Sequence, residues 1–423
     1  MRFLSRLLYS LLMYVLWPIW LVVTLVQACK RGGGRRFITE RMGWWRDDSG
    51  PNGGQSILWF HAASVGELRS IFPLITGLAI DESLRFVVTS NTPESFRDLE
   101  RFIEKNNFSK RVAHQYCAID FYFSVQRMVR HINSNALFVV ETELWMNLLF
   151  AVKSADKYFG ILNGRLSKKT VGANDIVKFF YAQMLKDIDH VAARSAQDAM
   201  AFISLGAKEN AVEVVGNLKR IMLEKEQATQ NRHEALIDTP YVLALSTRDG
   251  EEEIIWNAWK QIEAAPLLVI APRHVRRSAE IESVLHDSGA AVSVRSRSEA
   301  ISSQTDVYLA DTMGEAEMLA VDAQWVFVGG SLVNSGGHNV LEPAQWGKRV
   351  VCGPFVDNVQ EDVQWLKDLD VLVQVSAVEN AAEVFSVLLS EPRDCQVGVR
   401  ELMFEASSNL LAVYLKTCRL ALD

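Results

Sequence analysis

Carboxylate side chains in this sequence follow apolar stretches that have the composition of buried β-strands. Glu67 comes shortly after the stretch 56–62, and Glu141 and Glu143 lie at the end of the stretch 136–143. Ligands of open α/β sheets bind beyond the carboxyl ends of the strands, so this pattern favours a ligand-binding or catalytic site. Glu67 could be a general base for a hydroxyl nucleophile, or it could only complement the dipole of the helix that follows.

An amide and two cations occupy comparable positions farther along the first half. Asn163 lies at the end of the stretch 158–164, Arg165 comes directly after it, and Lys219 follows the stretch 212–217. Lys219 could neutralise negative charge that develops in a reaction, or it could be a solvated lysine between two domains.

The second half carries groups suited to binding an anion. Ser246, Thr247 and Gly250 lie between a strand pattern and a helix pattern and favour a nest of backbone amides. Arg273 ends another strand pattern and offers a fork of donors for a phosphate. The glycine-rich segment 329–343 would let backbone N–H groups approach a ligand closely.

Nucleotide binding is the best interpretation of these groups. Glu342 could accept two hydrogen bonds from the cis-diol of a ribose, and the segment 311–315 ends a further strand pattern. The sequence has neither the GxxxxGK[ST] motif of P-loop phosphohydrolases nor a GxGxxG motif after a strand, which disfavours those two classes.

Histidines also fall in the candidate site loops. They are His61, His274 and His338, and none stands in an HExxH motif or another metal-binding spacing. We therefore interpret them as hydrogen-bonding or loop residues and predict neither a metal nor a cofactor.

Short apolar runs that alternate with helical patterns position all of these residues. Such runs are typical of buried parallel strands, and a polar stretch at 223–238 separates two series of them. The pattern predicts an α/β protein with two βαβ domains of similar size. The runs are 56–62, 86–92, 136–143, 158–164, 190–195 and 212–217, then 241–247, 266–272, 291–296, 306–312, 325–331, 349–354 and 371–376.

Composition narrows the function classes further. The 423 residues are 49% hydrophobic and 22% charged, which is ordinary for a globular protein. A net charge of −7 argues against a nucleic-acid binder. The five cysteines form no CxxC pair, which disfavours a disulfide scaffold and a structural zinc site.

The N-terminal segment is unusually apolar. Residues 7–29 carry no charge, and as one helix they would span about 35 Å, more than a hydrocarbon core of about 30 Å. The larger basic cluster follows the segment, which predicts that the main body stays in the cytoplasm. We favour an anchor that spans the membrane or lies in its interface; a cleaved signal peptide and a lipoprotein signal at Cys29 are the alternatives. The residues of that cluster are Lys30, Arg31, Arg35 and Arg36.

Taken together, the motifs resemble those of the transferases of 3-deoxy-D-manno-octulosonic acid (Kdo). The resemblance implies a GT-B architecture, in which two Rossmann-like domains face each other across a cleft. It also implies CMP-Kdo as donor, a lipid A precursor as acceptor, no nucleic acid, and a place on the cytoplasmic face of a Gram-negative inner membrane. The motifs, in family order, are ERMG (40–43), HAASVGE (61–67), ETELWMN (141–147), NGRLS (163–167), GNLK (216–219), PRH (272–274), DTMGE (311–315) and GGSLVNSGGHNVLEP (329–343).

The same resemblance implies roles for individual residues. Glu67 matches the catalytic base, and Glu141 and Lys219 match positions that support the transition state. The positions that match contacts to CMP are Pro272, Arg273, Met313, Gly314, Glu315, Asn339, Val340, Leu341 and Glu342. The chain departs from the family pattern at Met146, Arg220-Ile221, Arg248 and Val275.

These observations predict five segments. They are a membrane anchor (1–30), an acceptor-binding domain (31–222), a linker (223–238), a CMP-Kdo-binding domain (239–400) and a C-terminal helix (401–423). We expect an inverting Kdo transferase of lipopolysaccharide biosynthesis. The alternatives are another GT-B nucleotide-sugar transferase or epimerase, and a membrane-anchored nucleotide-binding protein without catalysis.

Overall fold

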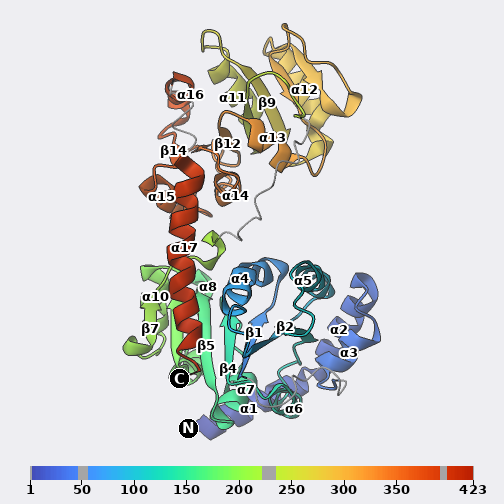
Figure 1. Ribbon diagram of the computed structural model, residues 1–423, viewed down its shortest axis with the longest axis vertical. Coiled ribbons are helices and arrows are strands. Elements are labelled where there is room, and N and C mark those ends of the chain that lie inside the picture. Colours follow the sequence, from blue (N-terminus) through green and yellow to red (C-terminus); the bar gives the residue numbers. More distant parts are fainter. Residues whose placement is uncertain (1, 46–55, 222–234, 391–397, 423) are drawn as a thin grey trace. The chain divides into compact units, whose positions relative to one another are not determined.

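The chain divides into two compact α/β units. The computed structural model describes residues 2–45, 56–221, 235–390 and 398–422 (Figure 1). Unit 1 comprises Met1–Glu224 and Ser407–Asp423, and unit 2 comprises Lys225–Ala406. Most of the expected linker, residues 223–234, lies outside the described residues.

Unit 1 is built on a parallel sheet of seven strands in the order β3-β2-β1-β4-β5-β6-β7. The chain therefore moves outward from β1 in one direction and resumes at β4 on the other side of β1. This reversal creates a switch point between β1 and β4, where ligands of open α/β sheets bind. The strands are β1 (Ser56–Ala62), β2 (Leu84–Ser90), β3 (Val112–Tyr116), β4 (Ala136–Val140), β5 (Tyr158–Gly164), β6 (His190–Ala193) and β7 (Val212–Val214).

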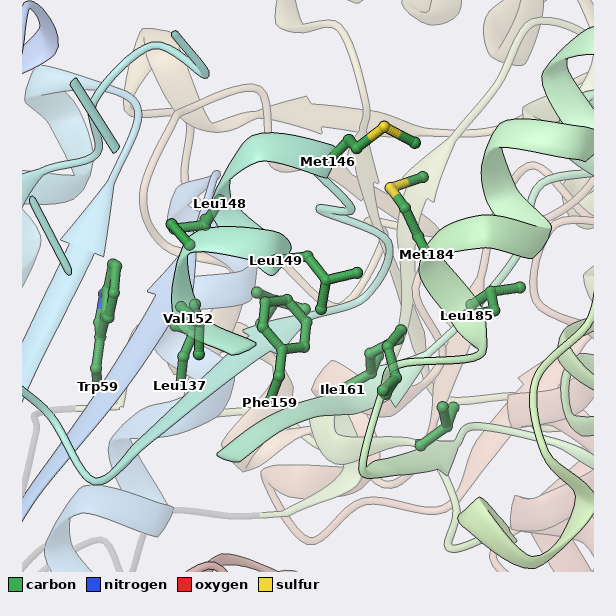
Figure 2. Close-up of a cluster of buried hydrophobic side chains, with 14 of the residues drawn as sticks. Trp59, Leu137, Met146, Leu148, Leu149, Val152, Phe159, Ile161, Met184 and Leu185 are labelled. Atoms are coloured by element: carbon green, nitrogen blue, oxygen red, sulfur yellow. The ribbon is translucent and has the colours of Figure 1, made fainter. Parts of the chain in front are cut away.

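Helices cover both faces of this sheet, so its strands are buried on both sides. Along β1, Trp59 belongs to the apolar cluster on one face, while Leu58 and Phe60 belong to the cluster on the other. Figure 2 shows the first cluster, in which Trp59, Leu137 and Phe159 of the sheet lie against side chains of α7 such as Leu149. The helices after the N-terminal pair are α3 (Gly34–Arg41), α4 (Val65–Leu78), α5 (Pro93–Lys105), α6 (Tyr122–Ile132), α7 (Met146–Ser154), α8 (Lys168–Val171), α9 (Asp175–Leu185), α10 (Ala196–Ser204), η2 (Glu209–Ala211) and η3 (Leu218–Arg220).

The apolar N-terminal segment forms two helices, α1 (Arg2–Val15) and α2 (Trp17–Arg31), bent by 56° relative to each other. The structure divides the single helix expected here because Pro18 lies in the first turn of α2, where it lacks an N–H and clashes with a continuing helix. In the described part of the chain, no single helix is long and apolar enough to cross a membrane, and this bent pair meets the criterion only jointly.

Unit 2 repeats the architecture with a parallel sheet in the order β10-β11-β9-β8-β12-β13-β14. Its switch point lies between β8 and β12. The strands are β8 (Tyr241–Thr247), β9 (Leu267–Pro272), β10 (Val292–Val294), β11 (Val307–Leu309), β12 (Val326–Val328), β13 (Val350–Cys352) and β14 (Leu372–Gln374). The helices are α11 (Glu251–Trp259), η4 (Val275–Arg277), α12 (Ser278–Asp287), η5 (Arg295–Arg297), α13 (Ala316–Asp322), α14 (Leu341–Gln345), α15 (Gln360–Asp368), η6 (Val378–Asn380) and α16 (Ala381–Ser390).

The C-terminal helix α17 runs over Gly398–Arg419, and its residues from Ser407 onward belong to unit 1. Tyr414 and Cys418 are fully buried in the apolar cluster that also contains residues of α4 and β1. The second half of α17 is therefore part of the core of unit 1.

Candidate functional site

The switch point of unit 1 brings together the carboxylates that the sequence singled out. Glu67 follows β1, Glu141 directly follows β4, and these strands are neighbours in the sheet. Burial raises the pKa of Glu67, and the negative charges of Glu141 and Glu143 raise it further. Hydrogen bonds from Ser64 and from the backbone of Ala63 oppose this shift without cancelling it.

Glu67 is held by the first turn of α4. Ser64 is the N-cap of α4, and its hydroxyl accepts a hydrogen bond from the Glu67 N–H at 3.3 Å. The Glu67 carboxylate in turn accepts hydrogen bonds from the Ala63 N–H at 2.9 Å and from the Ser64 hydroxyl at 2.8 Å. This arrangement is a variant of the capping box, so the helix-end role weighed from the sequence is present. The carboxylate keeps further lone pairs and is half-buried, so the cap and proton transfer are compatible.

Glu141 and Lys219 form an ion pair beside Glu67. Lys219 Nζ lies 2.7 Å from Glu141 Oε1. Glu141 has a positive φ of 60°, and its N–H donates to the carbonyl of Leu162 at 2.9 Å. The backbone therefore turns sharply at the end of β4 and directs this carboxylate toward the loop that carries the lysine.

Asn163 holds the loop that carries Lys219. Its side chain is buried, and its Oδ1 accepts a hydrogen bond from the Leu218 N–H at 2.9 Å. The Tyr414 hydroxyl, from α17, donates to the carbonyl of Gly216 at 2.7 Å. The sequence pointed to Asn163 as a site residue, but its position makes it a support for Lys219. No local sequence signal indicates Tyr414, because it is almost 200 residues away from the loop.

A third carboxylate, that of Glu143, lies at the same switch point. Glu143 Oε2 accepts a hydrogen bond from Trp145 Nε1 at 2.9 Å and lies 3.9 Å from Nε2 of the buried His61. His61 Nδ1 lies 2.9 Å from the Thr89 hydroxyl. Burial alone would raise the pKa of Glu143, but its interactions with His61 and Trp145 and the charge of Arg41 outweigh burial and lower it. The surroundings of Glu143 therefore favour its ionised form, whereas those of Glu67 disfavour it.

The ERMG segment contributes to structure near this site. The buried Glu40 accepts a hydrogen bond from the Tyr116 N–H at 2.7 Å. Arg41 Nη1 donates to Asn91 Oδ1 at 2.7 Å and to the carbonyl of Cys117 at 2.8 Å. These contacts attach α3 to the ends of β2 and β3.

At the switch point of unit 2, one buried carboxylate accepts hydrogen bonds from backbone amides that the sequence predicted to face a ligand. Glu251, in the first turn of α11, accepts hydrogen bonds from the N–H groups of Gly330, Ser331 and Leu332 and from that of Arg248, at 2.6 to 2.8 Å. The expectation that this part of the glycine-rich segment offers its amides to an anion is therefore wrong. Thr247 is also engaged, since its hydroxyl donates to Glu252 at 2.8 Å.

Basic side chains also lie at the switch point of unit 2, at the edge where the strands end. Arg273 and His274 follow β9 and are exposed. Arg248 follows β8, and its Nε–H donates to Nε2 of His338 at 3.0 Å. An anion at this edge would therefore have to be bound by side chains in place of the four amides that already donate to Glu251.

The remaining predicted contact residues differ in exposure. Met313 and Gly314 are exposed, whereas Glu315 pairs with Arg295, at 2.5 and 2.6 Å, and this lowers its pKa. Glu342 is exposed at the start of α14. The others are Pro272, Val340 and Leu341, which are buried, and Asn339, which is exposed and whose Oδ1 accepts from the Leu341 N–H at 3.1 Å. Among the described residues, no group of three or more His, Cys, Asp or Glu side chains could hold a metal ion.

Comparison with known proteins connects this site to a family. Residues 36–222 match the family described as 3-deoxy-D-manno-octulosonic-acid transferase (kdotransferase). The 3-deoxy-D-manno-octulosonic acid transferase of Haemophilus influenzae is 28% identical over 386 residues, which cover 89% of either chain. The protein of the same name from Aquifex aeolicus is also 28% identical and is covered over 92% of its length, against 86% of this chain.

A solved structure agrees at the level of the fold. A glycosyltransferase from Rickettsia africae is 11% identical and superposes with a TM-score of 0.58 over 88% of this chain and 100% of its own. At that identity the likeness concerns the fold alone. The sequence matches show that the chain is similar to Kdo transferases, over residues 36–222 for the family and over most of the chain for these relatives.

Proposed function

We propose that this protein is an inverting glycosyltransferase that moves Kdo from CMP-Kdo to a lipid A precursor in lipopolysaccharide biosynthesis. The observation that carries the proposal is the match of residues 36–222 to the Kdo transferase family, with Glu67 and the Glu141–Lys219 pair grouped at one switch point. The proposed reaction is inferred from the similarity to Kdo transferases. The geometry of the switch point provides side chains suited to that reaction.

Glu67 is the proposed general base. It takes the proton of an acceptor hydroxyl, whose oxygen then attacks the anomeric carbon of Kdo. The bond from that carbon to the phosphate oxygen breaks, and CMP leaves with the electron pair. Because the nucleophile enters opposite the leaving group, the anomeric configuration inverts. The raised pKa of Glu67 makes its carboxylate a stronger base than that of an ordinary glutamate.

Lys219 and Glu141 support the charge changes of this step. The 2.7 Å ion pair fixes the ammonium group near Glu67, where it can offset negative charge in the transition state. Since Lys219 and Glu141 are only partly buried, with side chains 45% and 25% exposed, the ammonium group is accessible to a substrate.

Unit 2 is the proposed donor-binding unit. Arg273 is suited to the phosphate of CMP, and the exposed Glu342 to the ribose hydroxyls. Residues 313–315 and 339–342 complete the proposed contacts. Because Val340 and Leu341 have buried side chains, they would contact CMP through backbone groups only. The carboxylate of Glu315 is paired with Arg295, so it would contact CMP beside or in place of that ion pair.

The N-terminal helices are the proposed membrane attachment, on the cytoplasmic face of the inner membrane. Side chains of α1 and α2 such as Met13 and Thr24 are buried against the rest of unit 1, while many apolar ones remain exposed. An apolar face bordered by basic residues suits the interface of an anionic bilayer. The exposed apolar residues are Leu7, Leu8, Leu11, Leu12, Tyr14, Val15, Trp17, Ile19, Val22, Val23, Leu25 and Val26.

Flotation with vesicles tests this attachment. Leu11→Glu should reduce binding to phosphatidylglycerol vesicles by more than tenfold, since it places a charge at the apolar face. Ile80→Glu, at an exposed apolar residue outside the helices, is the control and should bind as the parent does. Equal binding of Leu11→Glu and the parent would contradict the proposed attachment.

The catalytic assignment has a matched control in the chain. Glu67→Gln should lower the rate of Kdo transfer by about 10²- to 10⁴-fold, because the amide cannot accept the proton. Glu94 lies in the first turn of α5, which follows β2, and Glu94→Gln should leave the rate unchanged. Near-normal turnover by Glu67→Gln, with CMP release measured alongside transfer, would remove Glu67 from the mechanism.

A further inference from the structure

Four basic side chains meet at the switch point of unit 2. Arg248 follows β8, Arg273 and His274 follow β9, and His338 lies in the segment after β12. The three strands are adjacent, in the order β9-β8-β12. The charges of Arg248, Arg273 and His274 all act on His338, which places the four groups in one cluster.

His338 orients Arg248. The Arg248 Nε–H donates to His338 Nε2 at 3.0 Å, so that ring nitrogen carries the lone pair and the ring proton sits on Nδ1. Burial lowers the pKa of His338, and the neighbouring positive charges lower it further, which keeps the ring neutral and able to accept. The ring also packs on Gly330, where an added Cβ would come within 2.9 Å of its Cδ2. Arg248 is therefore held by an acceptor that is itself fixed.

Arg248 and Arg273 differ from three other arginines of unit 2. Arg277, Arg295 and Arg297 each bind carboxylates at 3.4 Å or less. Within the described ranges, neither Arg248 nor Arg273 has a carboxylate within 4.0 Å. Two guanidinium groups beside two histidines repel each other unless an anion lies between them.

Four backbone N–H groups at this switch point are not available to an anion. The carboxylate of Glu251 already accepts from the N–H groups of Gly330, Ser331 and Leu332 and from that of Arg248 itself. An anion at this edge would therefore need side-chain donors in place of these four amides.

We propose that Arg248, positioned by His338, is a second guanidinium of the donor site and binds anionic oxygens of the donor together with Arg273. The proposal rests on the proposed function and deepens it, since CMP-Kdo offers such oxygens in its phosphate and in the carboxylate of its sugar. Both sources present the planar or tetrahedral oxygen pairs that a guanidinium fork recognises.

Calorimetric titration of the whole chain tests the proposal. The ligands are cytidine, CMP, and CMP-Kdo in the absence of an acceptor, so that no transfer takes place. Arg248→Gln should weaken binding of a ligand whose anion it contacts by about 10- to 100-fold, and should leave cytidine unchanged. Equal loss for CMP and CMP-Kdo assigns the contact to the phosphate, and loss for CMP-Kdo alone assigns it to the carboxylate. Arg248→Lys should restore part of the affinity.

Two further variants separate this role from a structural one. Arg297→Gln removes the same charge from an exposed position of unit 2 and should bind every ligand as the parent does. His338→Ala should weaken binding less than Arg248→Gln, and the double variant should bind no more weakly than Arg248→Gln alone, because the histidine acts through the arginine. Parent-like binding of both CMP and CMP-Kdo by Arg248→Gln would overturn the proposal.

Failure of the proposed function gives a different result. A parent protein that binds neither CMP nor CMP-Kdo would contradict the proposed donor. The anion site is then judged with inorganic phosphate, which the parent should bind more tightly than Arg248→Gln. Equal binding of phosphate by the two proteins would overturn the anion site as well.

Discussion

Replacing Glu251 by glutamine should destabilise unit 2 far more than its small change in volume suggests. Glu251 Oε1 accepts from the N–H groups of Ser331 and Leu332, both at 2.8 Å, while Oε2 accepts from those of Gly330 and Arg248, at 2.6 and 2.8 Å. In either orientation of a glutamine, its NH₂ group faces two backbone donors. No rotation of the amide can satisfy all four.

The magnitude follows from this count. A hydrogen bond to a charged group contributes about 1.5–3 kcal/mol, so losing two of them should cost about 3–6 kcal/mol of the free energy of unfolding. Folded domains are stable by only about 5–15 kcal/mol in total, so the loss is a large fraction. Because three of the four donors lie in the segment after β12, the damage should be greatest there.

Urea unfolding and hydrogen exchange measure the two parts of this prediction. Glu251→Gln should lower the unfolding midpoint of unit 2, and a peptide covering 326–340 should lose protection of its amides. Glu253→Gln, an exposed carboxylate in the same helical turn, should change the free energy of unfolding by less than about 0.5 kcal/mol. A Glu251→Gln protein as stable as the Glu253→Gln control, with the peptide still protected, would refute the reasoning.

Three other predictions concern unit 1. Asn163→Ala removes the acceptor of the Leu218 N–H, so it should lower the free energy of unfolding in urea by about 1–3 kcal/mol. It should also reduce kcat, because the loop that carries Lys219 loses its support, while KM for CMP-Kdo stays the same. A changed KM with an unchanged kcat would contradict this. Glu67 must be deprotonated to act and its pKa is raised, so kcat should fall as the pH drops through a value above that of an ordinary glutamate. Glu141→Gln removes a negative charge that raises this pKa, so the acidic limb of the pH–rate profile should move to lower pH, and a limb that stays or moves up would exclude the coupling.

The strand pattern of both units was predictable from apolar runs, and the exception has a physical cause. The sequence prediction lacks β3, whose residues His114 and Gln115 interrupt the apolar run. Both are buried: His114 Nε2 lies 2.8 Å from the Ser90 hydroxyl, and Gln115 Nε2 lies 3.0 Å from a ring nitrogen of His131. These two contacts are made with other elements, which periodicity within one segment cannot indicate.

The candidate site was predictable in its residues but not in its supports. Glu67 and Glu141 follow the first and fourth strands, and they converge because β1 and β4 flank the switch point. In the sequence, Glu251 is one of three consecutive glutamates at the start of a predicted helix. Only the fold shows that it is buried and accepts hydrogen bonds from the amides of a distant loop. The support of the Lys219 loop by Tyr414 likewise depends on where α17 packs.

The central claim is that this protein transfers Kdo from CMP-Kdo, and mass spectrometry of a reaction mixture tests it most directly. Purified protein is incubated with a tetraacylated lipid A precursor and either CMP-Kdo or UDP-N-acetylglucosamine. We predict that the acceptor gains the mass of one or more Kdo residues only with CMP-Kdo, and that CMP appears in equal amount. An unchanged acceptor with CMP-Kdo, or a glycosylated acceptor or an epimerised sugar with the UDP donor, would contradict the account.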